Sequence, residues 1–550
     1  MENIKISRGM YPGLFGGVGF HNNDAMLYDL MDPEFFWQKV CKSYREIKPG
    51  FCRTFAGFYN WTKEAMDSFA EYYDLMQRRT DTPMYVTVPS IPLHFNDEEI
   101  ENYCEAVADK LAYLYFEKDV KHLRYYCLTN EMWRAKFGAF LTDLPGFKKY
   151  HTYLYHAFQK RSLPIGLLAT DAPQYENWKT VDWALENMDE ITDEYCVHIY
   201  ERQHDIHDLT FYDFFYNKCL EIVQKCLVSR KRVILGECGI QKIPPRTADP
   251  NGTGGEVQMT YLKGVIEDVC RYFRNSEDAA YCGLMMTELS FAAINAGIFA
   301  IAYWTFIDCP DPYNCRYSSQ DGFDRAWGEN EPFITPSMKV KYNKWGMYRW
   351  DDDGNHDVRP HYWALAPLAK FFCRNTRVLD TAADDPLLRS CAVAKRGGEK
   401  VTFGVVSRHD EPVEIRLDTQ LFKKPVRVYE YDTNNVPFNR FGDMQGVTAV
   451  LDPNEAVYTL KPQSVTYFTT DYDEKTKSVE AKLIGIKNGV LSWKSVSDPN
   501  HCYYRVFAGE TADFELNGAH QIASTAAEHL PVDNAKLCYR VLSVDQSGNI

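Results

Sequence analysis

The sequence predicts an α/β protein, a (β/α)8 TIM barrel followed by two all-β sandwich domains. Up to about residue 373, short apolar runs alternate with longer amphipathic segments, a pattern typical of repeated strand–helix units in a parallel sheet. The apolar runs number eight, which favours a closed barrel over an open sheet. Beyond residue 380 the helical pattern is replaced by short strands separated by turn residues, which predicts antiparallel sandwiches.

The barrel is expected to cover residues 1–375. Its predicted strands are the apolar runs 14–20, 51–55, 84–89, 123–128, 165–170, 194–200, 232–238 and 298–306. The predicted helices are residues 33–47, 63–79, 97–118, 153–161, 180–188, 212–227 and 256–273, and a ninth segment, 362–373, closes the series. The aromatic excursion 307–360 after the last strand is long for a compact domain, so we expect it to form a wall of a binding cleft. The alternative for its individual aromatic residues is a satellite core that packs on itself.

The first predicted β domain covers residues 376–472. Its expected strands are 389–395, 400–408, 413–417, 426–431, 456–460 and 464–469, with turn signals such as Gly397-Gly398 between them. A polar linker at 473–476 opens the second β domain, 473–550, with strands expected at 490–494, 503–508, 521–525 and 538–545. The order resembles a fibronectin type III module, in which Trp493 packs against strands containing Tyr504 and Tyr539.

Length, charge and apolar content exclude several classes of protein. At 550 residues the chain is too long for one core, and roughly three domains are expected. A formal net charge of -15 argues against a nucleic-acid partner, because phosphate binding needs clustered Lys and Arg. The chain has neither an apolar leader at its start nor an apolar run long enough to span a bilayer, so we expect no membrane partner and a cytoplasmic location.

Cysteine and aromatic usage are consistent with this class. The 16 cysteines lie at irregular spacings without a C-x-x-C pair, which indicates free thiols in a reducing compartment. Aromatic residues make up 15% of the chain. Their flat faces suit stacking on sugar rings, although large aromatic cores are the commoner cause of such a content.

Polar residues follow the apolar strands at the end of the barrel where TIM-barrel chemistry takes place. These strand-end residues are His21, Asn22, Asn23, Arg53, Asn130, Glu131, Asp171, His198, Tyr200, Glu237, Trp304 and Asp308. Nearly every strand contributes one, which core packing alone would not produce.

Glu131 and Glu237 are the candidate catalytic pair, at the ends of the fourth and seventh strands. Strand ends placed across a barrel can bring two carboxyl groups to about 5–5.5 Å, the separation used in retaining glycoside hydrolysis. Partial burial can raise the pKa of a strand-end Glu and keep it protonated as an acid. A Glu held in a salt bridge at a strand mouth is the structural alternative for each of them.

The barrel resembles the clan A glycoside hydrolases. Asn130-Glu131 is similar to their Asn-Glu pair, Glu237 to their nucleophile in a G-E-x-G setting, and the His198 and Tyr200 pair to their strand-six His-x-Tyr. Arg53 stands where family 5 members carry an Arg near the nucleophile, and Trp304 where they carry the Trp under the sugar. The order of the domains resembles family 39. Met132 replaces the Pro usual after the Glu there, so the family within the clan stays open.

This resemblance implies a retaining glycosidase acting on short oligosaccharides or glycosides. Glu131 would be the acid/base and Glu237 the nucleophile, whereas Arg53, Asn130, His198, Tyr200 and Trp304 would bind the substrate. The alternative is a non-catalytic carbohydrate-binding protein on the same barrel. The sequence does not indicate the oligomeric state.

Neither a cofactor nor a metal is expected. The glycine-rich residues 16–19 lack the final Gly of the dinucleotide fingerprint, and the chain has no P-loop. No His-x-His ends the first strand, and no His/Asp cluster has metal-ligand spacing.

Overall fold

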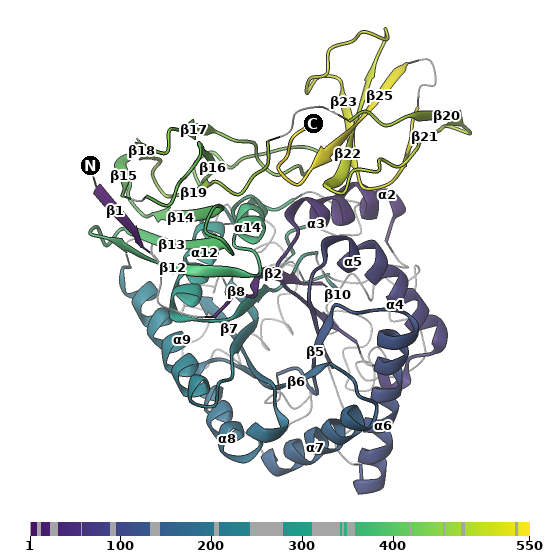
Figure 1. The fold of residues 1–550 in the computed structure, drawn as a ribbon, viewed down its shortest axis with the longest axis vertical. Coiled ribbons are helices and arrows are strands. Elements are labelled where there is room, and N and C mark those ends of the chain that lie inside the picture. The colour runs from purple at the N-terminus through teal and green to yellow at the C-terminus, as the bar shows by residue number, and fades with distance from the viewer. Residues whose placement is uncertain are drawn as a thin grey trace, which may run out of the picture.

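The fold is known from a computed structural model. It describes residues 2–7, 13–22, 31–56, 58–88, 95–131, 143–202, 208–241, 279–307, 309–310, 342–343, 346–348, 358–418, 420–454, 457–474, 479–533 and 537–550. The barrel and the two β domains lie against one another, with the β domains along one side of the barrel (Figure 1).

Eight parallel strands close into a barrel, which confirms the predicted fold class. They are β2 (Gly17–His21), β3 (Cys52–Phe55), β4 (Met84–Thr87), β5 (Leu123–Cys127), β6 (Gly166–Pro173), β7 (Glu194–Arg202), β8 (Val233–Gln241) and β9 (Ala300–Tyr303). β9 pairs with β2 through Gly17 opposite Ala300 and Phe20 opposite Tyr303, which closes the ring. The first predicted strand began at residue 14, but Phe15 forms an antiparallel bridge with Thr376 outside the barrel.

Helices cover the outside of the barrel. The helical segments are α2 (Pro33–Phe35), η2 (Phe36–Cys41), α3 (Lys42–Ile47), η3 (Phe58–Asn60), α4 (Lys63–Leu75), α5 (Gln77–Thr80), α6 (Asp97–Ala112), η4 (Tyr113–Glu117), α7 (Leu144–Lys160), η7 (Tyr175–Asn177), α8 (Lys179–Asn187), η8 (Asp189–Ile191), α9 (Thr210–Val228), α12 (Ala279–Ala296) and α14 (Pro360–Phe371). The predicted helix 256–273 and most of the excursion 307–360 lie outside the described residues; two short strands there, β10 (Cys309–Pro310) and β11 (Tyr342–Asn343), pair with each other.

Two of these helices correct the prediction. α7 begins at Leu144 instead of residue 153, because Asp143 caps its first turn by accepting a hydrogen bond from the Gly146 amide at 2.9 Å. Pro145 stands in that first turn, where a missing N–H costs nothing. α12 was not predicted, and it packs between the barrel and the first β domain.

Inward-facing side chains fill the barrel interior. This core consists of Phe51, Tyr85, Cys127, Leu168, Cys196, Ile234, Ala300 and Ala302, with Tyr125 and Phe299 packed against it. Gly236 leaves room for it, because a Cβ there would overlap the Cys196 sulfur and crowd the Tyr85 ring. The barrel interior is therefore a packed core and not a channel.

The first β domain is one nine-stranded sheet. In order of pairing its strands are β17 (Ala449–Leu451), β16 (Val426–Asp432), β19 (Ser464–Thr469), β14 (Val401–Ser407), β13 (Leu388–Lys395), β12 (Thr376–Ala383), β1 (Glu2–Ser7), β15 (Val413–Asp418) and β18 (Val457–Leu460). The sheet curls so that its two ends face each other. The evidence is that the ring of Tyr458 in the edge strand β18 contacts the ring of Phe468 in β19, at a centroid distance of 5.5 Å.

The first strand corrects the expected extent of the barrel, residues 1–375. β1 pairs with β12 through Ile4 opposite Ala383 and runs parallel to β15 with Ile4 opposite Leu417. Ile4 and Ile6 are buried in the core of this β domain. Residues 2–7 therefore belong to the sandwich, whereas the other expected boundaries stay predictions.

The second β domain consists of two three-stranded sheets. β20 (Leu483–Lys487), β21 (Val490–Trp493) and β24 (His529–Pro531) form one; β23 (Gln521–Thr525), β22 (His501–Gly509) and β25 (Cys538–Asp545) form the other. The sheets share a core in which Trp493 contacts Tyr504 at 5.5 Å between ring centroids. The predicted Trp–Tyr packing is confirmed, and the likeness to fibronectin type III stays a prediction.

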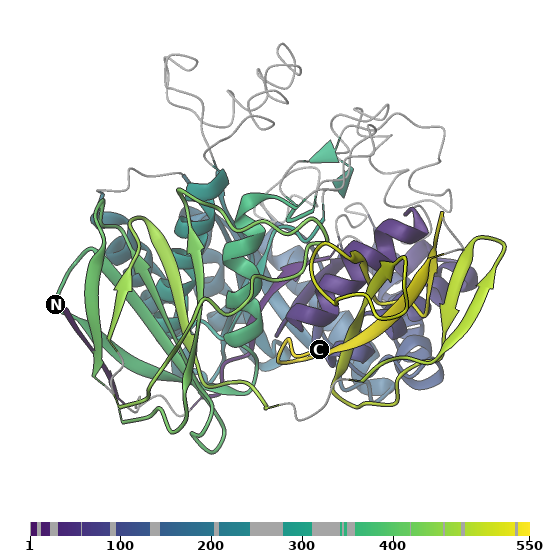
Figure 2. The ribbon, with the colours of Figure 1, turned by 90° about the horizontal axis from the view of Figure 1, so that it is seen from above.

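A buried cluster of charges joins the three domains, whose arrangement Figure 2 shows from above. The Lys42 ammonium in α3 lies 3.2 Å from Glu46 and 3.1 Å from Asp443 of the first β domain. Asp443 also accepts a hydrogen bond from Arg505 of the second β domain at 3.0 Å. We call this set the domain junction.

Two further predictions concern the cysteines and the membrane. In the described part of the chain the cysteines are free thiols, most of them buried, as expected. None of the described helices combines the length and the apolar character needed to cross a bilayer.

Candidate active site

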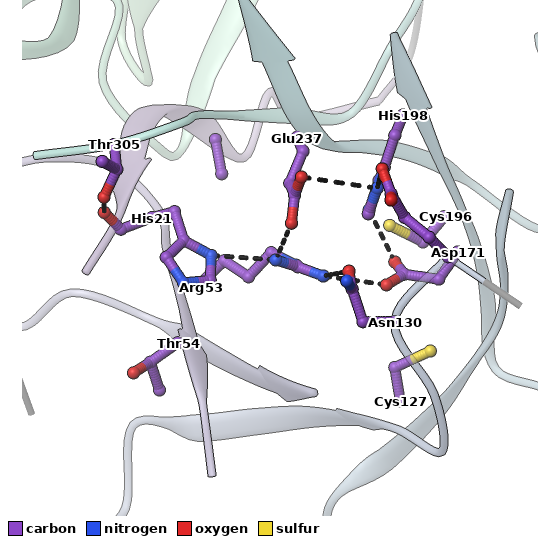
Figure 3. Close-up of polar contacts among 12 residues, drawn as sticks. His21, Arg53, Thr54, Cys127, Asn130, Asp171, Cys196, His198, Glu237 and Thr305 are labelled. Atoms are coloured by element: carbon purple, nitrogen blue, oxygen red, sulfur yellow. Dashed lines mark hydrogen bonds and ion pairs between the residues drawn. The ribbon is translucent and has the colours of Figure 1, made fainter. Parts of the chain in front are cut away.

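The strand-end side chains meet at one end of the barrel, above the packed interior (Figure 3). Arg53 comes from β3, Glu237 from β8 and His198 from β7, whereas Asn130 and Glu131 directly follow β5. Each of these five side chains is buried. The predicted catalytic and binding residues are thus brought together, although they lie far apart in the sequence.

Arg53 stands at the centre of this arrangement with each of its N–H groups directed at an acceptor. Its Nε donates to the Tyr85 hydroxyl at 2.7 Å, and one Nη2 hydrogen goes to Asn130 Oδ1 at 2.6 Å. The other acceptors are Asp171 Oδ2 and His21 Nδ1, both at 2.9 Å, and Glu237 Oε1.

These bonds determine the protonation and orientation of the acceptors, because a guanidinium can only donate. His21 accepts at Nδ1 and therefore carries its proton on Nε2 as a neutral imidazole. Asn130 accepts at Oδ1, so its amide nitrogen is the atom left to donate to a bound ligand.

The two predicted catalytic carboxylates face each other. One oxygen of Glu131 and one of Glu237 lie within 4.8 Å, together with a nitrogen of His198. Both residues are buried, with exposed fractions of 3% for Glu131 and 4% for Glu237. Glu131 has a φ of 46°, in the left-handed region that a Glu rarely adopts and that is found at functional sites.

Both oxygens of Glu237 accept a hydrogen bond. Arg53 donates to Oε1, and the Tyr200 hydroxyl donates to Oε2 at 2.6 Å. Burial raises the pKa of Tyr200, and the charges of Glu237 and Glu131 raise it further, so this phenol keeps its proton. Two donors, one of them cationic, thus fix the orientation of the Glu237 side chain.

His198 lies between the two glutamates. Its Nδ1 is 3.5 Å from Glu131 Oε1 and 3.8 Å from Glu237 Oε2, and its Nε2 is 2.9 Å from Asp171 Oδ1. Burial lowers the pKa of this imidazole, but the charges of Asp171 and Glu237 outweigh burial and raise it to about 9. His198 is therefore a cation at neutral pH.

Trp304 forms part of the same surface. Its ring is half-buried and contacts His21 at 4.4 Å and Phe55 at 5.7 Å between ring centroids. Such a ring offers an apolar face at the edge of the polar cluster, which suits stacking on a sugar. Asn23 and Asp308, also expected at strand ends, lie outside the described residues.

The sequence identified Asp171 as a strand-end residue but not as part of the site, and it did not identify Tyr85. The signal for Asp171 was a lone carboxylate directly after an apolar strand, the same signal that identified Glu131. Tyr85 had no comparable signal, because an inward-facing Tyr in an apolar strand is usually core. Its hydroxyl links Arg53 to Asp171.

Two groups of side chains among the described residues have the spacing of metal ligands. They are Asp171, Cys196 and His198, and Glu131, His198 and Glu237. The Arg53 guanidinium and the charged His198 already supply the positive charge that these carboxylates need. The donor set thus fits an ion-paired hydrogen-bond network better than a metal centre.

No known protein family and no curated protein matches this sequence. Solved structures do match. The catalytic domain of GH30 xylanase C from Talaromyces cellulolyticus is 12% identical, with 85% of this chain and 99% of that chain covered, at a TM-score of 0.54.

Two other structures are similar to the same extent. An α-L-arabinofuranosidase from Thermotoga maritima is 12% identical over 86% of this chain and all of its own, with a TM-score of 0.53. A monomeric β-xylosidase from Caulobacter crescentus is 12% identical over 85% of this chain and 98% of its own, with a TM-score of 0.52. At this identity the similarity shows a shared fold, and it confirms the predicted barrel.

Proposed function

We propose that this protein is a retaining glycoside hydrolase. The observation that carries the proposal is the pair Glu131 and Glu237, of which one oxygen each lie within 4.8 Å of each other, at the ends of strands of a closed eight-stranded barrel. This separation suits direct attack by one carboxylate and leaves no room for the extra water that an inverting mechanism needs. Solved structures with the same fold carry the names of glycoside hydrolases, which supports the choice of reaction class.

The contacts of the two glutamates assign their roles. Glu237 is the nucleophile, because Arg53 and Tyr200 donate to its two oxygens and hold the side chain in one orientation. Glu131 is the acid/base: it gives its proton to the glycosidic oxygen while Glu237 bonds to the anomeric carbon, and it then takes a proton from the attacking water.

The other predicted binding residues act on the sugar in this scheme. Asn130 directs its amide nitrogen, the atom not held by Arg53, at the sugar 2-oxygen. Trp304 lies under the ring as an apolar floor. The printed names of the neighbours include a xylanase, a xylosidase and an arabinofuranosidase, so aryl xylosides and arabinofuranosides are the first substrates to test.

The experiment is covalent trapping with a panel of dinitrophenyl 2-deoxy-2-fluoroglycosides, followed by mass spectrometry of the labelled peptide. We expect one sugar per chain, attached to Glu237, and no label on Glu237→Gln. Glu194→Gln is the matched control, because Glu194 is also buried and pairs with an Arg, Arg232 at 2.6 Å, but it lies at the start of β7. This control should be labelled like the wild type.

A second variant tests the acid/base. Glu131→Gln should lower kcat by about 100- to 10,000-fold on substrates with poor leaving groups. Azide should restore turnover of dinitrophenyl glycosides and give a glycosyl azide. Saturable sugar binding without label or turnover for any member of the panel would instead support the non-catalytic carbohydrate-binding protein.

A further inference from the structure

Asp171 is placed in the site by an irregularity in β6. Thr170 pairs with Cys196 and Ala172 pairs with Val197, so Asp171 is the extra residue of a β-bulge. Its φ of 55° lies in the left-handed region. Bulges of this kind redirect a side chain and are common beside active sites. Here the redirected carboxylate is completely buried.

Both oxygens of Asp171 are bonded to groups that in turn contact the catalytic glutamates. Oδ2 accepts from Arg53 at 2.9 Å, and Arg53 binds Glu237. Oδ1 accepts from the Tyr85 hydroxyl and from His198 Nε2, the latter at 2.9 Å. In Figure 3, Asp171 lies on the far side of Arg53 and His198 from Glu237, so it acts through its neighbours.

We propose that Asp171 is a positioning residue that holds His198 as an imidazolium, with Nδ1 3.5 Å from Glu131 and 3.8 Å from Glu237. This cation stabilises the carboxylate that Glu131 becomes after it has protonated the leaving group. The inference rests on the proposed function. It adds to that function a third carboxylate, which itself never transfers a proton.

The geometry supports the charged form of His198. In the proposed cycle Glu237 enters as a carboxylate, so a neutral ring with its proton on Nε2 would point the Nδ1 lone pair at this anion, 3.8 Å away, whereas a protonated Nδ1 is attracted to it. The same charge attracts Glu131, 3.5 Å away, once Glu131 has given up its proton. The titratable or charged groups around His198 and Asp171 are Glu131, Glu237, Arg53, Tyr85, Cys127, Cys196 and Tyr200. The charges of His198 and Arg53 hold the pKa of Asp171 well below its usual range despite burial, so Asp171 stays an anion.

Asp171 and His198 keep their protonation states through the whole reaction cycle. In the first step the proton of Glu131 moves to the glycosidic oxygen, which keeps the electrons of the broken C–O bond, and Glu237 forms an ester with the anomeric carbon. In the second step water gives its proton to Glu131 and its hydroxyl to the anomeric carbon, which releases Glu237. The imidazolium faces Glu131 only as a charge.

The first test measures the charge of His198 without turnover. The protein is labelled with 13C at histidine Cε1, the His198 signal is assigned as the one missing in His198→Gln, and the signal is titrated. In the wild type we expect an imidazolium at pH 7.5. In Asp171→Asn the ring should be neutral at this pH, with a midpoint below pH 7, because burial is no longer offset by the Asp171 charge.

Asp81→Asn is the matched control. Asp81 also has a left-handed φ, 61°, and also pairs with one Arg and one His, Arg374 at 2.6 Å and His122 at 2.8 Å. It caps α5 ahead of β4, at the opposite end of the barrel from the site. The His198 titration should be the same in Asp81→Asn as in the wild type.

The second test measures kcat/KM against pH for a dinitrophenyl and an alkyl glycoside. Asp171→Asn should lower the value for the alkyl glycoside by about 100-fold and the value for the dinitrophenyl glycoside far less, because only the former needs the acid. The basic limb of this profile reports the deprotonation of Glu131. It should move to higher pH in Asp171→Asn, because the positive charge lost from His198 is closer to Glu131 than the negative charge removed with Asp171. Asp171→Asn should have little further effect on a His198→Gln background.

The possible outcomes separate this inference from the proposed function. A neutral His198 in the wild type at pH 7.5 overturns the inference even if Asp171→Asn fails to fold. An equal loss on both substrates, or an unmoved basic limb, also overturns it. A charged His198 in a protein that neither cleaves nor traps any glycoside refutes the hydrolase while the Asp171–His198 assignment stands.

Discussion

Substituting Lys for Arg53 tests whether the guanidinium organises the site. The five N–H groups of Arg53 reach five acceptors, namely Tyr85, His21, Glu237, Asn130 and Asp171. A Lys has three N–H groups, so at least two buried acceptors lose their donor. Each loss costs about 1–3 kcal/mol, and Arg53→Lys should therefore lower the free energy of unfolding by about 2–6 kcal/mol.

The measurement is urea unfolding followed by tryptophan fluorescence and far-UV circular dichroism, with midpoints compared at equal slope. Arg161→Lys is the control, because Arg161 also pairs with two carboxylates, Glu105 and Asp109, but at the surface. Surface pairs contribute about 0–1 kcal/mol, so this variant should unfold close to the wild type. If Arg53→Lys loses no more stability than Arg161→Lys, the guanidinium is not the element that the site depends on.

Three further predictions follow from the structure. The folded-state pKa of about 9 for His198 exceeds its ordinary value of 6.5, so its stabilisation is complete below pH 6.5 and is lost as the pH rises through 9. The free energy of unfolding, measured by denaturant titration at several pH values between 6 and 10, should fall by about 3 kcal/mol as the pH rises. This fall should be absent in His198→Gln. Gly236→Ala should destabilise the barrel by about 1–3 kcal/mol, measured as a lower melting temperature, because its Cβ overlaps the Cys196 sulfur. Asp443→Asn should cost about 1–3 kcal/mol, because the buried Lys42 keeps Glu46 but loses its second carboxylate, and the half-buried Arg505 loses the carboxylate that it binds; calorimetry should show a lower or split transition, and an unchanged one would refute the role of the junction.

The barrel was predictable because its periodicity is local. Each strand is a short apolar run that ends in polar residues, and the ends of parallel strands meet at one edge of the barrel. The predicted site residues therefore came together without any information on distances. Asn130 and Glu131 illustrate this, since an apolar strand that stops at an amide and a carboxylate already marks the mouth of the barrel.

Other features depend on tertiary contacts that leave no local pattern. α12 is largely apolar and almost fully buried, because the barrel covers one face and the sandwich the other, so it has no amphipathic repeat to detect. In the sequence, Tyr85 has the pattern of a core residue. Only the structure shows that its hydroxyl accepts a hydrogen bond from Arg53. The bulge that turns Asp171 inward is visible only once β6 and β7 are paired.

The placement of β1 has a consequence for how the chain is made. Its partners β12 and β15 are translated only after the whole barrel, so β1 emerges from the ribosome long before either exists. Contacts between such distant segments form slowly, and an unpaired strand is prone to associate with other chains. A chain shortened to begin at β2 would leave β12 and β15 without their common partner strand. Both would then be unpaired edge strands, which are prone to aggregate. A shortened chain that keeps the sandwich should therefore also keep residues 2–7, and a barrel expressed alone should lack both.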